Sequence, residues 1–217
     1  MLINCVNNAT EAWEWWYDRL LRQNNQQPSR DGAVVGEFLN ACTVIRDPRQ
    51  GLVLSEKRDL SIKYAVGELL WYLSGSDRLS DILPYSKAWE KLSDNGRTIN
   101  SAYGHRIQYK FGFNQWEYVK NLLIRDPFSR QAVIHIKEPN NSYTKDLPCT
   151  ICIQYFIRDN RLHSTVYMRS NDIWMGFPYD VFCFTSLQVK MAMELGVDLG
   201  EYTHIAGSLH LYERNVK

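Results

Sequence analysis

Two cysteines three positions apart are the side chains with the clearest chemical potential in this 217-residue chain. Cys149 and Cys152 lie in DLPCTICIQYFI, residues 146–157, which turns apolar after the first of them. A structural zinc site needs about four ligands, and the sequence offers no second CxxC and no HxxxH. If a strand begins by Thr150, side-chain alternation sends the two thiols to opposite faces. The spacing therefore disfavours a metal or redox pair. It leaves one nucleophile beside a packing cysteine, or two buried cysteines.

The neighbours of Cys149 favour the nucleophile. Pro148 fixes the local backbone and lacks an N–H, which suits a residue held at the start of a strand. Downstream, in YMRSNDIWMGFPYD, Tyr167 and Arg169 share one strand face by the period of two. A guanidinium near a thiol lowers the pKa of the thiol and can also bind an anion. The ordinary alternative for Arg169 is a surface salt bridge.

The composition indicates one globular domain. A chain of 217 residues with 45% hydrophobic residues can bury one sizeable core. A formal net charge of +1 gives no general attraction to nucleic acid, so no stable nucleic-acid binding is expected. No apolar run approaches the ~20 residues of a membrane span, and the acidic start does not resemble a signal peptide. Five cysteines, an odd and sparse set, argue against a disulfide framework. We therefore expect a soluble cytoplasmic protein without a membrane partner.

Four segments have the pattern of helices that would position these side chains. Residues 9–23 predict a helix with Thr10 as N-cap. Residues 61–75 predict the clearest helix, with Gly75 as its end and an apolar stripe of Ile62, Ala65, Val66, Leu69, Leu70 and Leu73. Residues 114–127 predict another helix, with Pro127 just past its end. Residues 181–196 are apolar nearly all round, which is typical of a buried helix, and Gly196 closes it.

Strands are predicted mainly in the second half of the chain. Residues 130–136 alternate between polar and apolar side chains. Residues 151–157 and 162–170 have the pattern of paired strands around the turn RDNR. The polar residues 22–32 predict a loop. Strands mixed with long helices indicate an α/β or α+β fold, and the close strand pair makes a purely parallel sheet unexpected.

Six ordered motifs resemble the thymidylate synthase and deoxycytidylate hydroxymethylase superfamily, from about residue 30 to residue 212. They are GELLWYLSG, AWE with SAYG, RDPFSRQAV, LPC, RSND with GFPYD, and GSLHLY. The resemblance implies a thymidylate synthase-like fold, with a large mixed β-sheet flanked by helices and a homodimer packed sheet to sheet. Residues 1–217 would form a single catalytic domain. Because family chains usually continue well beyond HLY, the domain would lack the C-terminal segment of the family or close over folate differently.

The resemblance also implies the ligands and the catalytic residues. The ligands would be a pyrimidine nucleoside monophosphate and 5,10-methylenetetrahydrofolate as co-substrate, with no metal. Cys149 would attack ring carbon 6 of the pyrimidine, and Cys152 would only pack. Glu68 would organise proton transfer through water, although it lies off the predicted apolar stripe, where a solvated carboxylate is usual. Tyr103 would assist proton removal at carbon 5. Trp89 and Asp172 would lie at the folate.

The same resemblance places other residues around the nucleotide. Arg30, Arg130, Arg169 and Ser170 match residues that bind the phosphate, and Arg130 would reach the phosphate of the partner subunit. Gln131 stands where a second arginine is usual, so one positive charge is missing. The residues beside the base and the sugar would be Asn171, Asp172, His210 and Tyr212, although Asn171 and Asp172 could also simply cap a turn.

Asp180 is the residue that distinguishes the branches of the superfamily. Thymidylate synthases carry asparagine after PF, whereas this chain reads PYD. An ionised carboxylate only accepts hydrogen bonds, so it suits the amino group of cytosine and repels the carbonyl oxygen of uracil. We therefore predict a cytidylate 5-hydroxymethylase acting on dCMP or CMP. The alternatives are a thymidylate synthase that methylates dUMP and a non-catalytic nucleotide- or RNA-binding homologue. The intact Cys149, Glu68 and Tyr103 argue against the latter.

Overall fold

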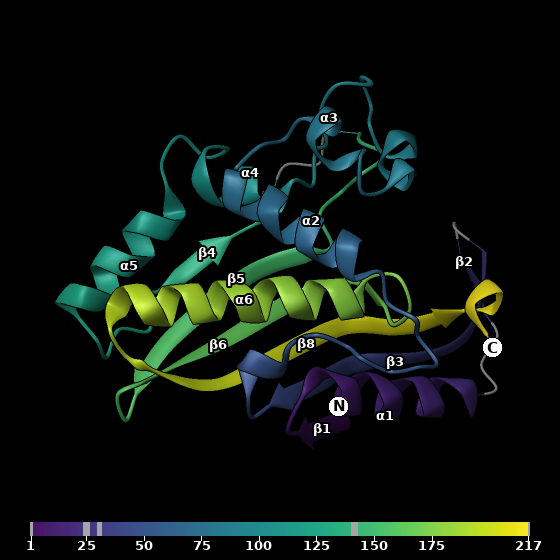
Figure 1. The fold of residues 1–217 in the computed structure, drawn as a ribbon, viewed down its shortest axis with the longest axis horizontal. Helices are drawn as coiled ribbons and strands as arrows, with labels where there is room; N and C mark the ends of the chain where they lie inside the picture. The colour runs from purple at the N-terminus through teal and green to yellow at the C-terminus, as the bar shows by residue number, and fades with distance from the viewer. Residues whose placement is uncertain (1, 24–26, 30–31, 140–142, 217) are drawn as a thin grey trace.

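One mixed sheet organises the protein (Figure 1). The computed structural model describes residues 2–23, 27–29, 32–139 and 143–216. Eight strands are found in this part of the chain: β1 (Leu2–Val6), β2 (Gln27–Ser29), β3 (Gly32–Ile45), β4 (Val133–His135), β5 (Thr150–Arg158), β6 (Arg161–Met168), β7 (Asn171–Asp172) and β8 (Asp198–Tyr212).

The sheet combines parallel and antiparallel pairs. Its order is β1-β3-β8-β6-β5-β4, with β2 also pairing β3 and β7 also pairing β8. The pairs β1 with β3, β6 with β8 and β7 with β8 are parallel, and the others are antiparallel. The expected large mixed sheet flanked by helices is therefore confirmed.

The helices that touch the sheet also touch one another, so they cover the same face. They include α1 (Ala9–Leu21) and α6 (Phe177–Leu195), which lie along the sheet in Figure 1. Above α6 lie α2 (Ile62–Ser74) and α4 (Tyr103–Gln108). The remaining helices are α3 (Leu79–Ile82) and α5 (Gln115–Arg125), with short 3-10 turns at Pro48–Gln50, Lys87–Lys91 and Glu213–Asn215. Within the described ranges, no helix combines the length and the hydropathy needed to cross a bilayer.

The core between α1, α6 and the sheet is strongly aromatic. Trp13 and Trp16 of α1 are fully buried. The Nε1 of Trp13 donates to the carbonyl of Ile173 at 2.8 Å, and the Nε1 of Trp16 donates to the Oγ1 of Thr43 at 2.7 Å. Each indole thus buries a large apolar area while its polar atom is satisfied. The bond to Ile173 also fixes the segment that joins β7 to α6.

Four predicted helix boundaries can be compared with the structure. The N-cap of α1 is Asn8 rather than Thr10, because Asn8 accepts from the backbone of Glu11 at 2.9 Å. The Thr10 hydroxyl accepts instead from the backbone of Leu54 at 2.9 Å and fixes a distant loop. Helix α5 ends before Pro127, as predicted. Helix α6 ends at Gly196 with φ +68°, as predicted, but begins at Phe177, earlier than the pattern indicated.

The buried face of α2 was predicted wrongly. The proposed stripe includes Ile62, Val66, Leu70 and Leu73, whose exposed fractions are 54%, 43%, 54% and 40%. The face turned inward carries Ala65, Gly67, Glu68, Trp71 and Tyr72. Large aromatic rings dominate burial on that face, and the 3.6-residue period alone could not decide between two partly apolar faces.

The predicted hairpin around RDNR is confirmed. β5 and β6 pair antiparallel, and Asp159 and Asn160 in the turn have φ of 51° and 57°. Such positive φ values at both turn residues match the twist of the strands they join. The strand predicted over 130–136 is shorter, at Val133–His135. The polar segment 22–32 is not only a loop, because Gln27–Ser29 pairs with β3.

Candidate active site

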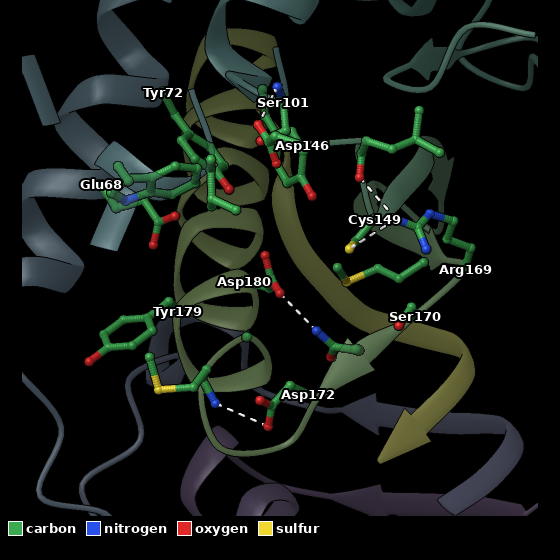
Figure 2. Close-up of a pocket in the computed structure, with 18 of the residues that line it drawn as sticks. Glu68, Tyr72, Ser101, Asp146, Cys149, Arg169, Ser170, Asp172, Tyr179 and Asp180 are labelled. Carbon is green, nitrogen blue, oxygen red and sulfur yellow. Dashed lines mark hydrogen bonds between the residues drawn. The ribbon is translucent and has the colours of Figure 1, made fainter. Parts of the chain in front are cut away.

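A pocket of about 330 Å³ opens where α2, α4, the start of α6 and the strand ends meet. β6 and β8 run parallel, so their carboxyl ends reach the same edge of the sheet, and β5 begins there. Cys149 precedes β5, Arg169 follows β6, and Asp180 lies in the first turn of α6. Figure 2 shows Asp180 between Glu68 and Cys149. The fold thereby brings residues from distant segments to one cavity.

Arg169 holds the segment that presents Cys149. Its Nε donates to the carbonyl of Pro148 at 3.0 Å, and its Nη2 donates to the carbonyl of Leu147 at 2.9 Å. The same Nη2 lies 3.7 Å from the Cys149 sulfur (Figure 2). The backbone N–H of Arg169 also donates to the carbonyl of Cys149 at 2.8 Å. The positive charge is therefore fixed beside the Cys149 sulfur.

Cys152 lies in a different environment. It pairs with Tyr167 on one side and His135 on the other within the sheet, and it does not line the pocket. Burial raises the pKa of the Cys152 thiol, which makes it a poorer nucleophile. Of the two cysteines, Cys149 is thus the one that lines this pocket.

Glu68 is a buried acid on the inner face of α2, with 7% of its surface exposed. Burial, together with the nearby charge of Asp180, raises the pKa of Glu68 to about 8, although a hydrogen bond with Tyr64 opposes the shift. The carboxyl group therefore holds a proton at neutral pH. Its Oε2 has no hydrogen-bond partner among the described residues and is available to a bound molecule.

Tyr103 connects α4 to the segment that carries Cys149. Its hydroxyl accepts a hydrogen bond from the backbone N–H of Thr150 at 3.2 Å, one residue after Cys149. Burial first, and then the nearby Cys149, raise the pKa of Tyr103 well above its usual value. The hydroxyl therefore keeps its proton and can donate it in a hydrogen bond toward the pocket.

Asp180 is the second acid of the pocket with a raised pKa. Its Oδ2 accepts from the Nδ2 of Asn171 at 2.8 Å. Burial raises the pKa of Asp180 to about 7; the bond from Asn171 opposes this shift and the charge of Asp172 adds to it. Asp172 itself caps the turn into α6, because its Oδ1 accepts from the backbone of Trp174 at 2.8 Å. Burial raises the pKa of Asp172 as well.

Further predicted residues complete the wall. Ser170, His210 and Tyr212 line the pocket, and the rings of His210 and Tyr212 meet edge to face at 5.0 Å. Trp89 lines it from the Lys87–Lys91 turn, and its Nε1 donates to the Tyr64 hydroxyl at 3.1 Å. The structure therefore gathers Cys149, Glu68, Tyr103, Asp180, Arg169, Ser170, Asn171, Asp172, His210, Tyr212 and Trp89 around one cavity.

Two of the predicted residues do not line this cavity, and a third, Arg30, falls outside the described residues. Arg130 and Gln131 are exposed on the turn before β4 and do not line the pocket of their own chain. This position leaves untested the prediction that Arg130 serves the site of a partner subunit.

The sequence analysis did not predict several residues that line the pocket. Tyr64, Trp71 and Tyr72 lie on the same face of α2 as Glu68, at spacings of four and three residues that the sequence does contain. Asp146 also lines the pocket and accepts from the backbone N–H of Ser101 at 2.8 Å. An aromatic residue one turn on either side of a glutamate was the available signal for this face.

The wall fits a polar aromatic ligand. The indole Nε1 of Trp71 is buried without a hydrogen-bond partner among the described residues, as is the Oε2 of Glu68. Trp71 also meets Trp89 edge to face at 5.2 Å. A donor, a carboxyl oxygen and aromatic surface are what a heterocycle with ring nitrogens and carbonyls requires. Among the described residues, no group of three or more His, Cys, Asp and Glu side chains could hold a metal ion.

Comparisons with known proteins give a consistent assignment. The family model described as thymidylate synthase matches residues 12–217. The chain is 31% identical over 196 residues to the deoxyuridylate hydroxymethyltransferase of Bacillus phage SP01, covering 83% of this chain and 51% of that protein. It is 31% identical over 173 residues to the thymidylate synthase of Bacillus atrophaeus, covering 76% of each. It is 30% identical to the thymidylate synthase of Bacillus subtilis subsp. natto, covering 76% of this chain and 62% of that protein. The match thus spans about half the length of the phage protein.

The buried acid Glu68 predicts that stability depends on pH. Its pKa is about 8 in the folded protein, above its ordinary value, so the unfolded chain loses this proton first as pH rises. The free energy of unfolding should therefore fall from about pH 5 to about pH 8. Glu68→Gln has no proton to lose. Its stability relative to the unsubstituted protein should rise by on the order of 3 kcal/mol over that interval.

Urea denaturation at several pH values measures this difference. Glu56→Gln is the matched control, because Glu56 is exposed and does not line the pocket. Equal slopes for Glu68→Gln and the unsubstituted protein would contradict the buried, protonated state of Glu68.

Proposed function

This chain belongs to the thymidylate synthase family, and we propose that it transfers a one-carbon unit to carbon 5 of a cytidylate, giving the 5-hydroxymethyl nucleotide. The observation that carries the proposal is the contact between Cys149 and Arg169 in a pocket that also holds two acids with raised pKa values, Glu68 and Asp180. A nucleophile, an anion-binding group and proton-carrying groups are thereby collected around a ring-sized space.

The chemistry begins at Cys149. Carbon 5 of a pyrimidine is a weak nucleophile until a group adds to carbon 6. Attack by the Cys149 thiolate forms a carbon–sulfur bond there, and the ring electrons move so that carbon 5 becomes nucleophilic. Carbon 5 would then attack the methylene carbon of the folate, and loss of the carbon 5 proton would expel tetrahydrofolate and leave an exocyclic methylene. Addition of water to this methylene and expulsion of the thiolate would restore the ring. Arg169, at 3.7 Å from the sulfur, stabilises the thiolate at both ends of this cycle.

Proton movement is assigned to Glu68 and Tyr103. Glu68 has a pKa of about 8, so it can both give and take a proton near neutral pH. The Tyr103 hydroxyl lies at the residue next to Cys149 and can hydrogen-bond a water that removes the proton from carbon 5. Water held between these groups would also be the nucleophile that makes the product hydroxymethyl rather than methyl.

The one-carbon unit would be supplied by 5,10-methylenetetrahydrofolate. Trp89 and Trp71 would contact its ring system, and the unpartnered atoms of Trp71 and Glu68 would bond its polar edge. Asp172, which lines the same pocket, would also contact the folate. For the nucleotide, Arg169 and Ser170 would bind the phosphate, and His210 and Tyr212 the sugar.

Asp180 supports cytosine as the base. Once ionised, its carboxylate accepts from the amino group of cytosine and repels the carbonyl oxygen of uracil. A second candidate function is one-carbon transfer to a uridylate, as thymidylate synthase or uridylate hydroxymethylase. It is favoured by the names of the relatives, one of which is a deoxyuridylate hydroxymethyltransferase. Incubation with dCMP, CMP and dUMP and weighing of the products distinguishes the candidates.

We also propose that the protein is a homodimer in which the two sheets pack against each other. The helices that touch the sheet cover one face. Strand residues with large exposed apolar side chains include Ile3, Leu39 and Tyr167, at 51%, 66% and 37% exposure. Covering them with a second copy would remove apolar surface from water. In this arrangement Arg130 would leave its own chain and bind the phosphate in the pocket of the partner subunit.

Cys149→Ser should abolish turnover while nucleotide binding survives, because serine at neutral pH offers no comparable anion. Cys152→Ser should keep most of the activity, since Cys152 lies outside the pocket. Product formation is followed by mass spectrometry and nucleotide binding by calorimetry. Equal loss in both variants, together with zinc bound to the unsubstituted protein, would contradict the assignment.

Asp180→Asn should shift the preference from cytidylate toward uridylate. The new amide can accept from Asn171 through its oxygen and turn its NH2 toward the base, where it would donate to the uracil carbonyl. A mismatched buried polar contact costs ~1–3 kcal/mol, so the ratio of kcat/KM for the two nucleotides should move at least about tenfold. An unchanged ratio would count against Asp180 as the group that reads the base.

Arg130→Ala and Cys149→Ser should each be inactive alone and should complement each other when mixed. Arg130 supplies a charge-assisted contact across the interface, so a mixed dimer has one site with both defects and one with neither. Random reassortment makes about half of the dimers mixed, so activity should recover to roughly a quarter of the unsubstituted value. Subunit exchange verified by differential labelling, with no recovery, would place Arg130 in its own chain's site or outside the chemistry.

A further inference from the structure

A row of buried polar side chains runs from the core of the sheet to Asp180. The hydroxyl of Tyr202 lies 2.8 Å from the Nδ1 of His204, and the Nε2 of His204 lies 3.0 Å from the Oδ1 of Asn171. The Nδ2 of Asn171 then donates to the Oδ2 of Asp180 at 2.8 Å. Tyr202, His204 and Asn171 are 0%, 1% and 2% exposed. Neither His204 nor Tyr202 lines the pocket, so both could act only through Asn171.

The row has a definite direction. Burial lowers the pKa of His204 to about 3, so its ring is neutral and has one donor and one acceptor nitrogen. Asn171 gives an N–H to Asp180, which leaves its Oδ1 to accept from the ring. The Nε2 of His204 therefore carries the hydrogen. Its Nδ1 must then accept, and the hydroxyl of Tyr202 donates to it.

The opposite direction would leave a hydrogen without an acceptor. It would need a protonated Asp180 to donate a hydrogen bond to the Asn171 oxygen and His204 to donate from Nδ1 to the Tyr202 hydroxyl. The Tyr202 hydroxyl would then accept from Nδ1 of His204. Its own hydrogen would have no acceptor, because Nδ1 is the one acceptor found for it among the described residues. A buried donor without a partner is costly, so Tyr202 fixes the direction of the whole row.

Space at Gly176 allows the last bond of the row. A Cβ placed at this residue would lie 2.9 Å from the Asn171 Nδ2 and 3.1 Å from the Asp180 Oδ2. The backbone of Gly176 has φ −96°, which other residues adopt easily. The absence of a side chain is therefore required by the contact between Asn171 and Asp180 rather than by backbone conformation.

We propose that His204, with Tyr202 behind it, is a positioning residue that orients the Asn171 amide so that one oxygen of Asp180 is held as an acceptor and the other faces the base. This arrangement rests on the proposed function and sets the preference for cytosine over uracil. Without the bond from His204 the Asn171 amide can turn, and Asp180 keeps its proton to a higher pH. A protonated carboxyl group has one donor and one acceptor, so it can pair with either base.

The other titratable groups near Asp180 are unchanged when His204 is substituted, so their effect on the charge of Asp180 is the same in each His204 variant. They come from α2, α4, β7, β8 and α6 itself, and they are Glu68, Tyr72, Tyr103, Asp172, Tyr202 and Cys183. All are acids, so none of them supplies a positive charge that could replace the Asn171 bond. The Asn171 N–H is thus the contact through which the row can change the charge of Asp180.

A matched pair of substitutions at His204 tests the proposal. His204→Gln keeps a side-chain N–H at about the reach of Nε2, whereas His204→Met has a similar length and no donor. The first measurement needs no substrate. Long-range ¹H–¹⁵N spectra of the unsubstituted protein should show the Nε2–H form of His204. The ¹³C titration of the Asp180 carboxyl should move up by about one pH unit in His204→Met and stay nearly in place in His204→Gln.

The second measurement is the ratio of kcat/KM for cytidylate and uridylate from about pH 6 to about pH 9. At about pH 8 the ratio should fall about tenfold in His204→Met and less than about threefold in His204→Gln. An Nδ1–H or charged ring in the unsubstituted protein would overturn the proposal, and so would equal titrations of Asp180 in the two variants. If Asp180 shifts as expected while the ratio stays constant, the role in base preference is wrong.

These outcomes are separable from failure of the proposed function. If the unsubstituted protein has no preference for cytidylate, the assignment of the base fails. The ¹⁵N and ¹³C measurements would still decide whether His204 positions Asn171 and Asp180. Thermal unfolding of both variants shows whether either effect reflects loss of folded protein.

Discussion

The parallel pairing of β6 with β8 is the constraint on which the site depends. A parallel pair cannot be joined by a tight turn, so the chain must leave β6, cross the sheet and return. The crossing element is α6, which packs on both strands. Its beginning therefore lies beside the end of β6, and this is where Asp180, Arg169 and β7 meet. The antiparallel hairpin of β5 and β6 brings Cys149 to the same edge.

Burial in this pocket disfavours the ionised form of its carboxyl groups, and the protonation of the pocket follows from that. Glu68, Asp172 and Asp180 come from different elements, and burial is the first cause of the raised pKa of each. Three neighbouring carboxylates could not all be ionised there without repulsion and lost hydration. The fold instead favours the protonated form of these acids and places its guanidinium next to the Cys149 sulfur. The pocket therefore holds acids with raised pKa values together with a sulfur that lies beside a guanidinium.

Much of the fold could be predicted from the sequence, and the failures have physical reasons. The β5–β6 hairpin and the end of α6 rest on local signals, namely a turn that needs positive φ and a terminal glycine. The predicted orientation of α2 was wrong, because a helical period shows that two faces differ without showing which of them is buried. Cys149, Glu68 and Asp180 came from ordered motifs, which carry information about position. The residue His204 had no local signal, since its partner Asn171 is distant in sequence and only the parallel β7–β8 contact brings them together.

The acids of the pocket have a thermodynamic consequence for any ligand. Glu68 and Asp180 have pKa values of about 8 and about 7, so each is partly protonated in the range where cells work. A ligand that changes either value makes the protein take up or release a fraction of a proton as it binds. The apparent heat of association then includes the ionisation enthalpy of the buffer, and the slope of affinity against pH counts the protons exchanged. Ligand binding in this cavity is therefore coupled to proton binding, and the affinity for a ligand depends on the pH of the solution.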